Sequence, residues 1–162
     1  NANELFDLLQ NIALNKVEIA LHQYLPAFHS EYCAFAAFGA KAKRFPECDK
    51  FCTKHKVEIL DHKGKKHFLQ SDSECRNTLY LGTPRSALRL LPKLKKAGIT
   101  HFRLEMLDDS PEMVRRKIEI YASALNETLP LQEAIGLINA EEKYGVSEGQ
   151  LFNDSIWEDR KK

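Results

Sequence analysis

A core strand and the helix after it can be read from the stretch Thr100-His-Phe-Arg-Leu-Glu-Met-Leu107, which Ser110-Pro111-Glu112 soon follows. Apolar and polar side chains alternate along the first segment, with Phe102, Leu104 and Met106 on one side. A period of two residues is the pattern of a strand. The serine of the second segment can cap a helix, and the proline suits the first helical turn. The stretch therefore predicts a buried strand followed by a long helix.

The amino-terminal half shows the same mixture of helix and strand patterns. The spacing of its leucines predicts a helix from Asn3 to Leu14, and alternation predicts a strand from Val17 to His22. The segments Lys56–Leu60 and Lys65–Gln70 flank a turn that contains glycine, which is typical of a β-hairpin. Residues 27–45 fit either a short buried helix or an apolar loop beside a site.

The carboxyl-terminal half adds further helices. Thr83-Pro84 indicates a helix start, and Pro92 divides the apolar run that follows into two short helices, the second ending at Gly98. A last helix is expected from Leu131 to Lys143. The long helix after Ser110 has a predicted buried stripe that consists of Val114, Ile118, Tyr121 and Leu125.

The order of these elements predicts the fold class. A helix between two strands is the usual connection of parallel strands, so the chain is expected to be α/β with some parallel pairing. A complete eight-stranded barrel needs about 250 residues, and the chain has 162. We therefore expect an incomplete (β/α) barrel-like fragment with a β-hairpin and a cysteine-rich loop region.

The overall composition excludes several classes of protein. The net charge of +1 gives no whole-molecule field for nucleic acid, although residues 41–66 hold nine Lys or Arg against four acids. No apolar run reaches the length of about 18 residues that a membrane span needs. The first residues lack the pattern of a signal peptide, which favours the cytoplasm. Because the sequence begins Asn-Ala-Asn, we expect a piece of a longer protein.

The candidate site is defined by the cysteines. The chain has four, at Cys33, Cys48, Cys52 and Cys75. Four thiolates are the number that holds one 4Fe–4S cluster or one tetrahedral zinc ion. Their spacing does not separate iron from zinc, and it leaves buried free thiols and disulfides as alternatives. Disulfides are disfavoured in a reducing cytoplasm.

Six motifs occur in order between Val17 and Leu125. They are His29-Ser-Glu-Tyr-Cys33, Cys48-Asp-Lys-Phe-Cys52-Thr-Lys-His55, Val57-Glu-Ile-Leu-Asp61, Asp72-Ser-Glu-Cys75-Arg-Asn-Thr78, Leu94-Lys-Lys-Ala-Gly-Ile99 and Phe102-Arg-Leu-Glu105. In order and spacing, this set resembles the collagenase-like peptidases of family thirty-two, the family of unknown catalytic type. No single motif suffices, and the combination is specific.

The resemblance implies a fold, a cofactor and candidate residues. Members of that family have a barrel-like α/β domain with a cysteine-bound 4Fe–4S cluster. Several act in oxygen-independent hydroxylation, either of an RNA base or of a quinone precursor in ubiquinone biosynthesis, and others are described as proteases. By resemblance, the four cysteines are the cluster ligands. The last motif matches a family strand, which makes Glu105 and Arg103 candidate catalytic residues at the carboxyl end of a barrel strand. A structural ion pair is the alternative role for these two residues.

The resemblance also implies that the chain corresponds to the carboxyl-terminal part of the family domain. Residues 1–128 then form the end of the barrel domain with the cysteine metal site, and residues 129–162 form a helical tail. Three functions remain open: the iron–sulfur part of an RNA or quinone hydroxylation protein, a collagenase-like protease, and a non-catalytic metal-stabilised binding module. The expected partners are RNA, a quinone precursor, and a chain or segment that supplies the missing barrel strands. We expect the chain alone to be inactive.

Overall fold

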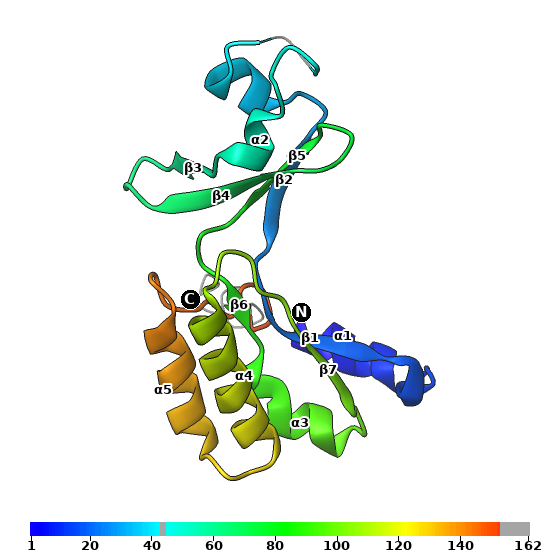
Figure 1. Ribbon diagram of the computed structural model, residues 1–162. Coiled ribbons are helices and arrows are strands. Elements are labelled where there is room, and N and C mark those ends of the chain that lie inside the picture. Colours follow the sequence, from blue (N-terminus) through cyan, green and yellow to red (C-terminus); the bar gives the residue numbers. More distant parts are fainter. Residues whose placement is uncertain (43–44, 153–162) are drawn as a thin grey trace, which may run out of the picture. The chain divides into compact units, whose positions relative to one another are not determined.

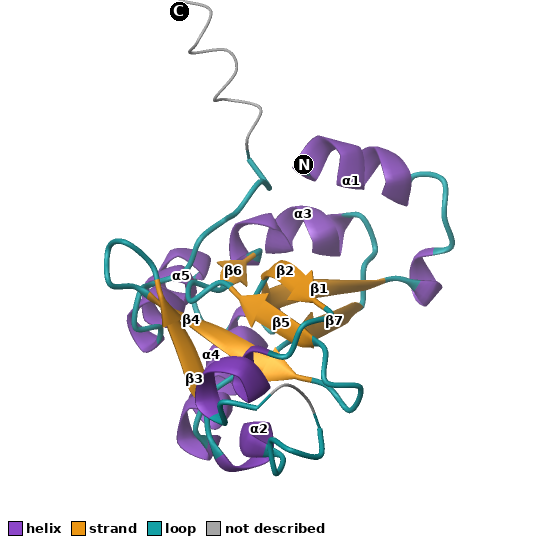
Figure 2. Cartoon of the chain, turned by 90° about the horizontal axis from the view of Figure 1, so that it is seen from above, coloured by secondary structure: helices purple, strands orange, loops and turns teal. Residues whose placement is uncertain are grey.

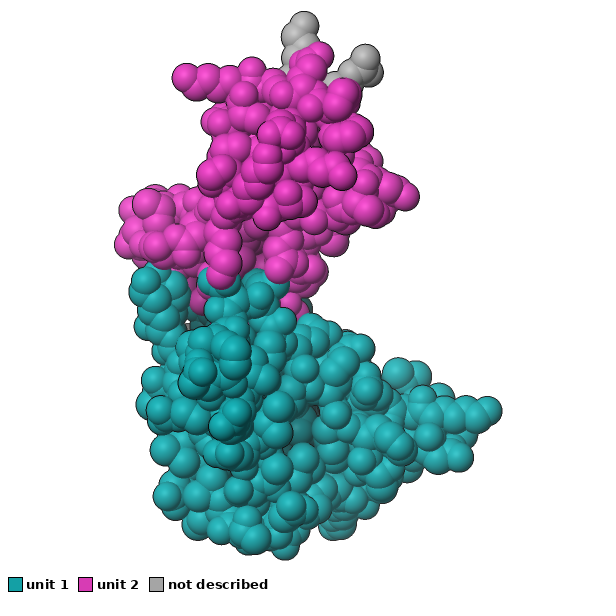
Figure 3. All heavy atoms as spheres, viewed as in Figure 1, with its two compact units in different colours: residues 1–23, 83–162 teal, residues 24–82 magenta. Residues whose placement is uncertain are grey.

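The protein is described by a computed structural model in which residues 1–42 and 45–152 are placed (Figure 1). It divides into two compact units, which Figure 3 shows in different colours. Unit 1 comprises Asn1–Gln23 and Thr83–Lys162, and unit 2 comprises Tyr24–Gly82. Each unit has a β-sheet and a hydrophobic core of its own.

Unit 1 contains a three-stranded sheet in the order β6-β1-β7. Strand β1 (Glu18–Gln23) pairs in parallel with β7 (His101–Leu104) and antiparallel with the short β6 (Arg85–Ser86). The register of β1 against β7 shifts between Ala20 and His22, as at a β-bulge. Both strands predicted from alternation are confirmed, and so is the parallel pairing.

The helices of unit 1 pack on one another and on this sheet. They are α1 (Ala2–Leu9), α3 (Leu91–Lys96), α4 (Pro111–Leu125) and α5 (Leu131–Glu141), with short 3-10 turns at Leu14–Lys16 and Leu88–Leu90. Helices α4 and α5 lie side by side and contact each other (Figure 1). The hydrophobic core of unit 1 includes Leu21, Leu94 and Ile138, whose side chains have no exposed surface. Such burial of apolar area is the main stabilising term of the unit.

The helix ends explain which predictions hold in unit 1. Ser110 caps α4 by accepting a hydrogen bond from the Met113 N–H at 3.3 Å, as predicted. Helix α1 is capped at Asn1 and ends at Leu9, well before Leu14. The predicted buried stripe of α4 was partly wrong, because Ile118 is 49% exposed.

The expected helix start at Thr83-Pro84 was wrong. The residues that follow form β6, because Arg85 and Ser86 pair with Gln23 and His22 of β1. Strand pairing over this sequence separation overrides the local proline signal. The second predicted helix is confirmed as α3, with Pro92 in its first turn and Gly98 beyond its end at a φ of 95°.

Unit 2 is built on a four-stranded antiparallel sheet in the order β2-β5-β4-β3 (Figure 2). The strands are β2 (Pro26–Ser30), β3 (Val57–Leu60), β4 (Lys66–Ser71) and β5 (Asn77–Tyr80). The predicted hairpin is confirmed by the pairing of β3 with β4. A π-helical turn (Phe35–Gly39) and the short α2 (Phe51–Lys54) complete the unit. Its small core consists of Phe35, Leu69 and Leu79.

The predicted α/β class is therefore confirmed in the coarse sense that two sheets are combined with several helices. Within residues 1–42 and 45–152 the strands form no closed barrel. No helix in these ranges is long and apolar enough to cross a membrane. Part of the predicted helical tail, residues 153–162, lies outside the described residues.

Candidate metal centre

All four cysteines belong to unit 2, where they lie on turns and short helices around the sheet. Cys33 follows β2, Cys48 lies in the turns before α2, Cys52 is in α2, and Cys75 lies in the turn between β4 and β5. All four are free thiols. Three separate segments of the unit therefore supply the candidate ligands.

Cys33 is held next to the start of β5 by a buried amide. Asn77, which is 1% exposed, accepts a hydrogen bond through Oδ1 from the Ala34 N–H at 2.6 Å. Its Nδ2 lies 4.0 Å from Cys33 Sγ, within reach of a weak hydrogen bond to sulfur. The Cys33 carbonyl accepts from the Ala37 N–H at 3.1 Å, which begins the helical turn. The backbone around this thiol is consequently well defined.

Cys48 and Cys52 are connected by a tight reversal. Asp49 and Lys50 both have positive φ, at 44° and 50°, and the Cys48 carbonyl accepts from the Phe51 N–H at 3.0 Å. Left-handed backbone is unfavourable for residues with a Cβ, so this reversal carries local strain. Strain of that kind is concentrated at ligand-binding loops.

Cys75 also has positive φ, at 65°, in a turn organised by Asp72. The Asp72 carboxylate accepts from the N–H groups of Glu74 and Arg76, both at 2.9 Å, and its second oxygen lies 2.8 Å from Arg76 Nε. These contacts lower the pKa of Asp72, chiefly through the hydrogen bond from Arg76. The carboxylate remains charged and holds the turn that presents the thiol.

The thiols influence one another electrostatically. Burial raises the pKa of Cys75, and the charges of Cys33, Cys48 and Cys52 raise it further. Cys33 and Cys52 also pack against the same small core of Phe35, Leu69 and Leu79. The three other thiols are thus within electrostatic range of Cys75, and their charges disfavour its ionisation. A bound cation reverses this balance because it stabilises thiolates.

The donor set fits a thiolate-bound metal in its chemistry. Four sulfurs from one small unit match the ligand requirement of a 4Fe–4S cluster or of a Cys₄ zinc ion. Among the described residues, no three His, Cys, Asp or Glu side chains already stand in metal-binding geometry.

The two predicted catalytic residues lie in unit 1, on and just after β7. Arg103 Nη2 is 2.8 Å from Glu105 Oε1, and Arg103 Nη1 is 3.2 Å from Glu18 Oε1. The Glu105 N–H extends the sheet by donating to the His22 carbonyl at 2.8 Å. Arg103 is therefore neutralised by carboxylates on both sides. All three side chains are roughly half exposed, so these ion pairs contribute little stability.

A buried charge cluster in unit 1 was not predicted from the sequence. Lys117, fully buried on α4, forms ion pairs with Asp109 and Glu142, whose side chains are 2% and 5% exposed. His22 Nε2 lies 3.2 Å from Glu142 Oε1. The signal available was the spacing of Lys117, Tyr121 and the following buried alanine along one face of α4. The sequence pattern did not lead us to predict that this lysine is buried.

Tyr121 links this cluster to the sheet. Its hydroxyl lies 3.0 Å from His22 Nδ1 and 3.0 Å from Ser86 Oγ. Burial raises the pKa of Tyr121 above its ordinary value, because the phenolate is poorly solvated there. The hydroxyl consequently stays protonated and joins α4 to β1 and β6.

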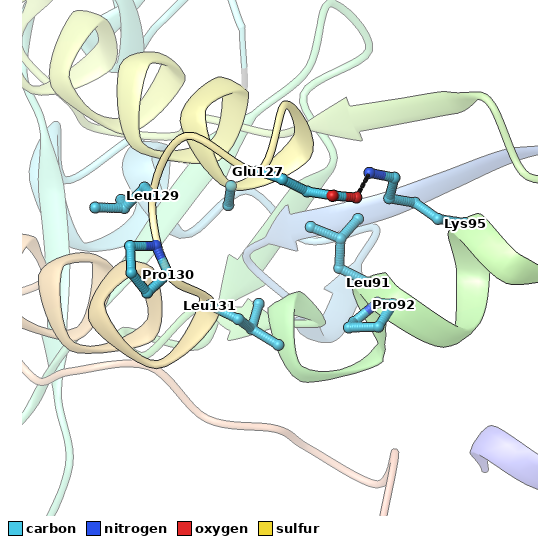
Figure 4. A pocket seen from close by; sticks show the side chains of 8 residues that line it. Leu91, Pro92, Lys95, Glu127, Leu129, Pro130 and Leu131 are labelled. Carbon is cyan, nitrogen blue, oxygen red and sulfur yellow. Dashed lines mark hydrogen bonds and ion pairs between the residues drawn. The ribbon is translucent and has the colours of Figure 1, made fainter.

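A shallow groove of unit 1 lies between α3 and the loop from α4 to α5 (Figure 4). Leu91, Leu129 and Leu131 are among its apolar lining residues. Lys95 Nζ forms an ion pair with Glu127 and donates to the Leu125 carbonyl at 2.9 Å, at the end of α4. Lys95 and Glu127 are therefore paired with each other, and Lys95 also caps the carboxyl-terminal end of α4.

Comparison with known proteins identifies the family. Residues 1–153 match the sequence model of Peptidase family U32. A search of the curated proteins and a search of the solved structures gave no significant match. The family match covers nearly the whole chain, including both units and all four cysteines. On this ground, the chain belongs to Peptidase family U32.

Proposed function

We propose that the chain is the iron–sulfur-binding part of a family U32 protein that acts in oxygen-independent hydroxylation of an RNA base or a quinone precursor. The observation that carries the proposal is the grouping of all four cysteines in unit 2, with their charges acting on Cys75. When bound, a 4Fe–4S cluster supplies one-electron transfer. Zinc is the alternative occupant of the same thiols.

The residues around the thiols support this role. The Asp72 turn presents Cys75, the Asn77 amide fixes the segment of Cys33, and the left-handed pair Asp49 and Lys50 turns the chain between Cys48 and Cys52. Hydrogen bonds of this kind orient metal ligands and tune the reduction potential of a cluster. The Asn77 amide near Cys33 is the donor best placed for such tuning.

An open strand edge in unit 1 supports the expected partner that supplies further strands. β7 lies at one end of the order β6-β1-β7 and pairs with β1 alone among the strands of the described ranges. An edge strand presents N–H and C=O groups that another strand can pair with. We propose that a further segment or chain of the whole protein extends this sheet, next to Arg103 and Glu105.

The proposal is tested by anaerobic purification followed by iron, sulfide and zinc analysis. We expect a brown protein with the broad visible absorbance of thiolate-to-iron charge transfer, and loss of this absorbance in Cys33→Ser, Cys48→Ser, Cys52→Ser and Cys75→Ser. Ser73→Ala changes the Cys75 turn without removing a thiol and is the matched control. A colourless protein that contains zinc would support the metal-stabilised binding module instead.

The peptidase alternative is tested on the same samples. Cleavage of denatured collagen by the wild type that persists in all four serine variants would assign a protease whose cysteines are structural. Loss of iron in the variants, with no cleavage by the wild type, supports the redox role. Binding of RNA or of a quinone analogue to the iron-loaded protein then separates the two substrate classes.

A further inference from the structure

A second pocket of unit 1 contains no cysteine, and it shares Glu18 with the ion pairs of Arg103. It encloses about 340 Å³, within the size range of small-molecule sites. Four apolar side chains form its walls: Leu5 of α1, Ile19 of β1, Leu90 of the 3-10 turn before α3, and Leu151. Arg85 of β6 and Glu18 of β1 supply its charged groups.

Backbone hydrogen bonds hold the walls in place. The Ala2 N–H donates to the Leu151 carbonyl at 2.9 Å, which fastens α1 to the last described segment. The Ser86 N–H donates to the Ser147 carbonyl at 2.8 Å, beside the isolated bridge between Arg85 and Ser147. The pocket is therefore preformed, which lowers the entropic cost of binding a ligand.

Arg85 is the unusual group of this pocket. Its guanidinium is half-buried, and burial lowers its pKa because the cation has lost part of its hydration. With the Gln23 amide oxygen turned toward it, Arg85 donates to that oxygen from Nε at 3.1 Å and also from Nη2, which leaves Nη1 without a partner from Gln23. Within the described ranges, no carboxylate lies within ion-pair distance of Arg85. The charge of Glu105 raises the pKa of Arg85, but the effect of burial is larger.

A partly desolvated guanidinium without a carboxylate partner has donors left to offer. Arg has five N–H groups in a planar fork that matches two oxygens of a carboxylate or phosphate. The polar partner already present, Gln23, is neutral. An anion bound in the pocket would replace the lost hydration and pair with the charge.

We infer that this pocket binds a small ligand that has an apolar body and an anionic oxygen group, either a carboxylate or a phosphate. Arg85 binds the anionic group, and the walls formed by Leu5, Ile19, Leu90 and Leu151 contact the apolar body. Glu18 lines the pocket while one of its oxygens pairs with Arg103, and its carboxylate can also accept a hydrogen bond from a hydroxyl or amine of the ligand. This site goes beyond the proposed cluster and does not depend on it.

The test is a titration of the full ¹⁵N-labelled chain with inorganic phosphate and, separately, with butyrate, at constant ionic strength against chloride. We expect saturable shifts of the Ala20 and Ala87 amides. Arg85→Gln should weaken binding at least tenfold, since hydrogen bonds to a charged group are the strong ones. Arg115→Gln, on the exposed face of α4, is the matched control and should leave the affinity unchanged.

Two further outcomes separate the ligand sources and guard against misfolding. Saturation by phosphate alone assigns a phosphate ester, and saturation by butyrate alone assigns a carboxylic acid. Arg85→Lys keeps the charge but loses the planar fork, so several-fold weaker binding by this variant supports the site even if Arg85→Gln does not fold. Absence of saturable shifts in the wild type, or equal affinities of Arg85→Gln and Arg115→Gln, would overturn the inference.

Discussion

Replacement of Lys117 by Met should strongly destabilise unit 1. The lysine is fully buried between Asp109 and Glu142, whose side chains are 2% and 5% exposed. Methionine fills a similar volume but leaves two carboxylates in the interior without their shared cation. Removing one partner of a buried ion pair costs about 3–5 kcal/mol. We expect a loss near the upper end of that range, because one lysine serves two carboxylates.

The matched control is Arg116, the neighbouring basic residue on the same helix. Arg116 is 66% exposed and lies 2.5 Å from Glu141, whose side chain is 12% exposed, so Arg116→Met removes an ion pair whose cation faces solvent. Water screens an ion pair with an exposed cation, so we expect Arg116→Met to cost less than Lys117→Met. Urea unfolding followed by far-ultraviolet circular dichroism gives the free energy of unfolding of both variants.

The charge argument is isolated by a compensated variant. Combining Lys117→Met with Asp109→Asn and Glu142→Gln removes all three charges, and we expect it to recover much of the lost free energy. If Lys117→Met costs no more than Arg116→Met, or if the triple variant is less stable than Lys117→Met alone, then the buried charges do not govern the stability of unit 1.

The remaining predictions concern pH, two glycines and the thiols. Because burial raises the pKa of Tyr121, the folded form keeps its proton above about pH 10, where an unfolded tyrosine ionises. Stability should therefore be full below that pH and fall as pH rises, and Tyr121→Phe should flatten the decline in urea midpoints. Gly136→Ala should stabilise α5 by about 0.5–1 kcal/mol in thermal unfolding, since no atom lies within 4 Å of the added Cβ. Gly82→Ala should destabilise unit 2 instead, because its Cβ would lie 1.8 Å from the Lys66 carbonyl oxygen. In metal-free protein, Cys75 should react with iodoacetamide more slowly than a model thiol at neutral pH, because its pKa is raised. Its reaction rate should increase as pH rises. Mass spectrometry of the labelled peptide measures the rate.

Local signals in the sequence predict those elements whose ends are determined by neighbouring residues. The Ser110-Pro111 start of α4, the alternation of β1 and β7, and the hairpin of β3 and β4 all depend on contacts within a few residues or on a simple period. They were predicted correctly for that reason. β6 was missed because its partners lie in β1, about sixty residues earlier, and in the segment of Ser147.

The same distinction applies to the sites. The sequence predicts that the cysteines act together, and all four belong to unit 2. It does not reveal that Lys117 is internal, because the acids that neutralise its charge come from Asp109 and from Glu142 beyond α5. Arg85 was missed for a related reason. Its significance arises from burial and from the absence of a nearby carboxylate in the described part of the chain, and neither property is written in the local pattern.

The chain leaves unit 1 after Gln23 and returns to it at Thr83. Gln23 of β1 pairs with Arg85 of β6, so the two connections to unit 2 start from paired strands. Unit 2 is therefore an insertion whose two tethers meet at adjacent points of the host sheet. The core of unit 1 contains none of the four cysteines, so we expect oxidation of the thiols to affect unit 2 rather than the packing of unit 1. For the same reason, excising residues 24–82 and rejoining the ends needs only a short turn.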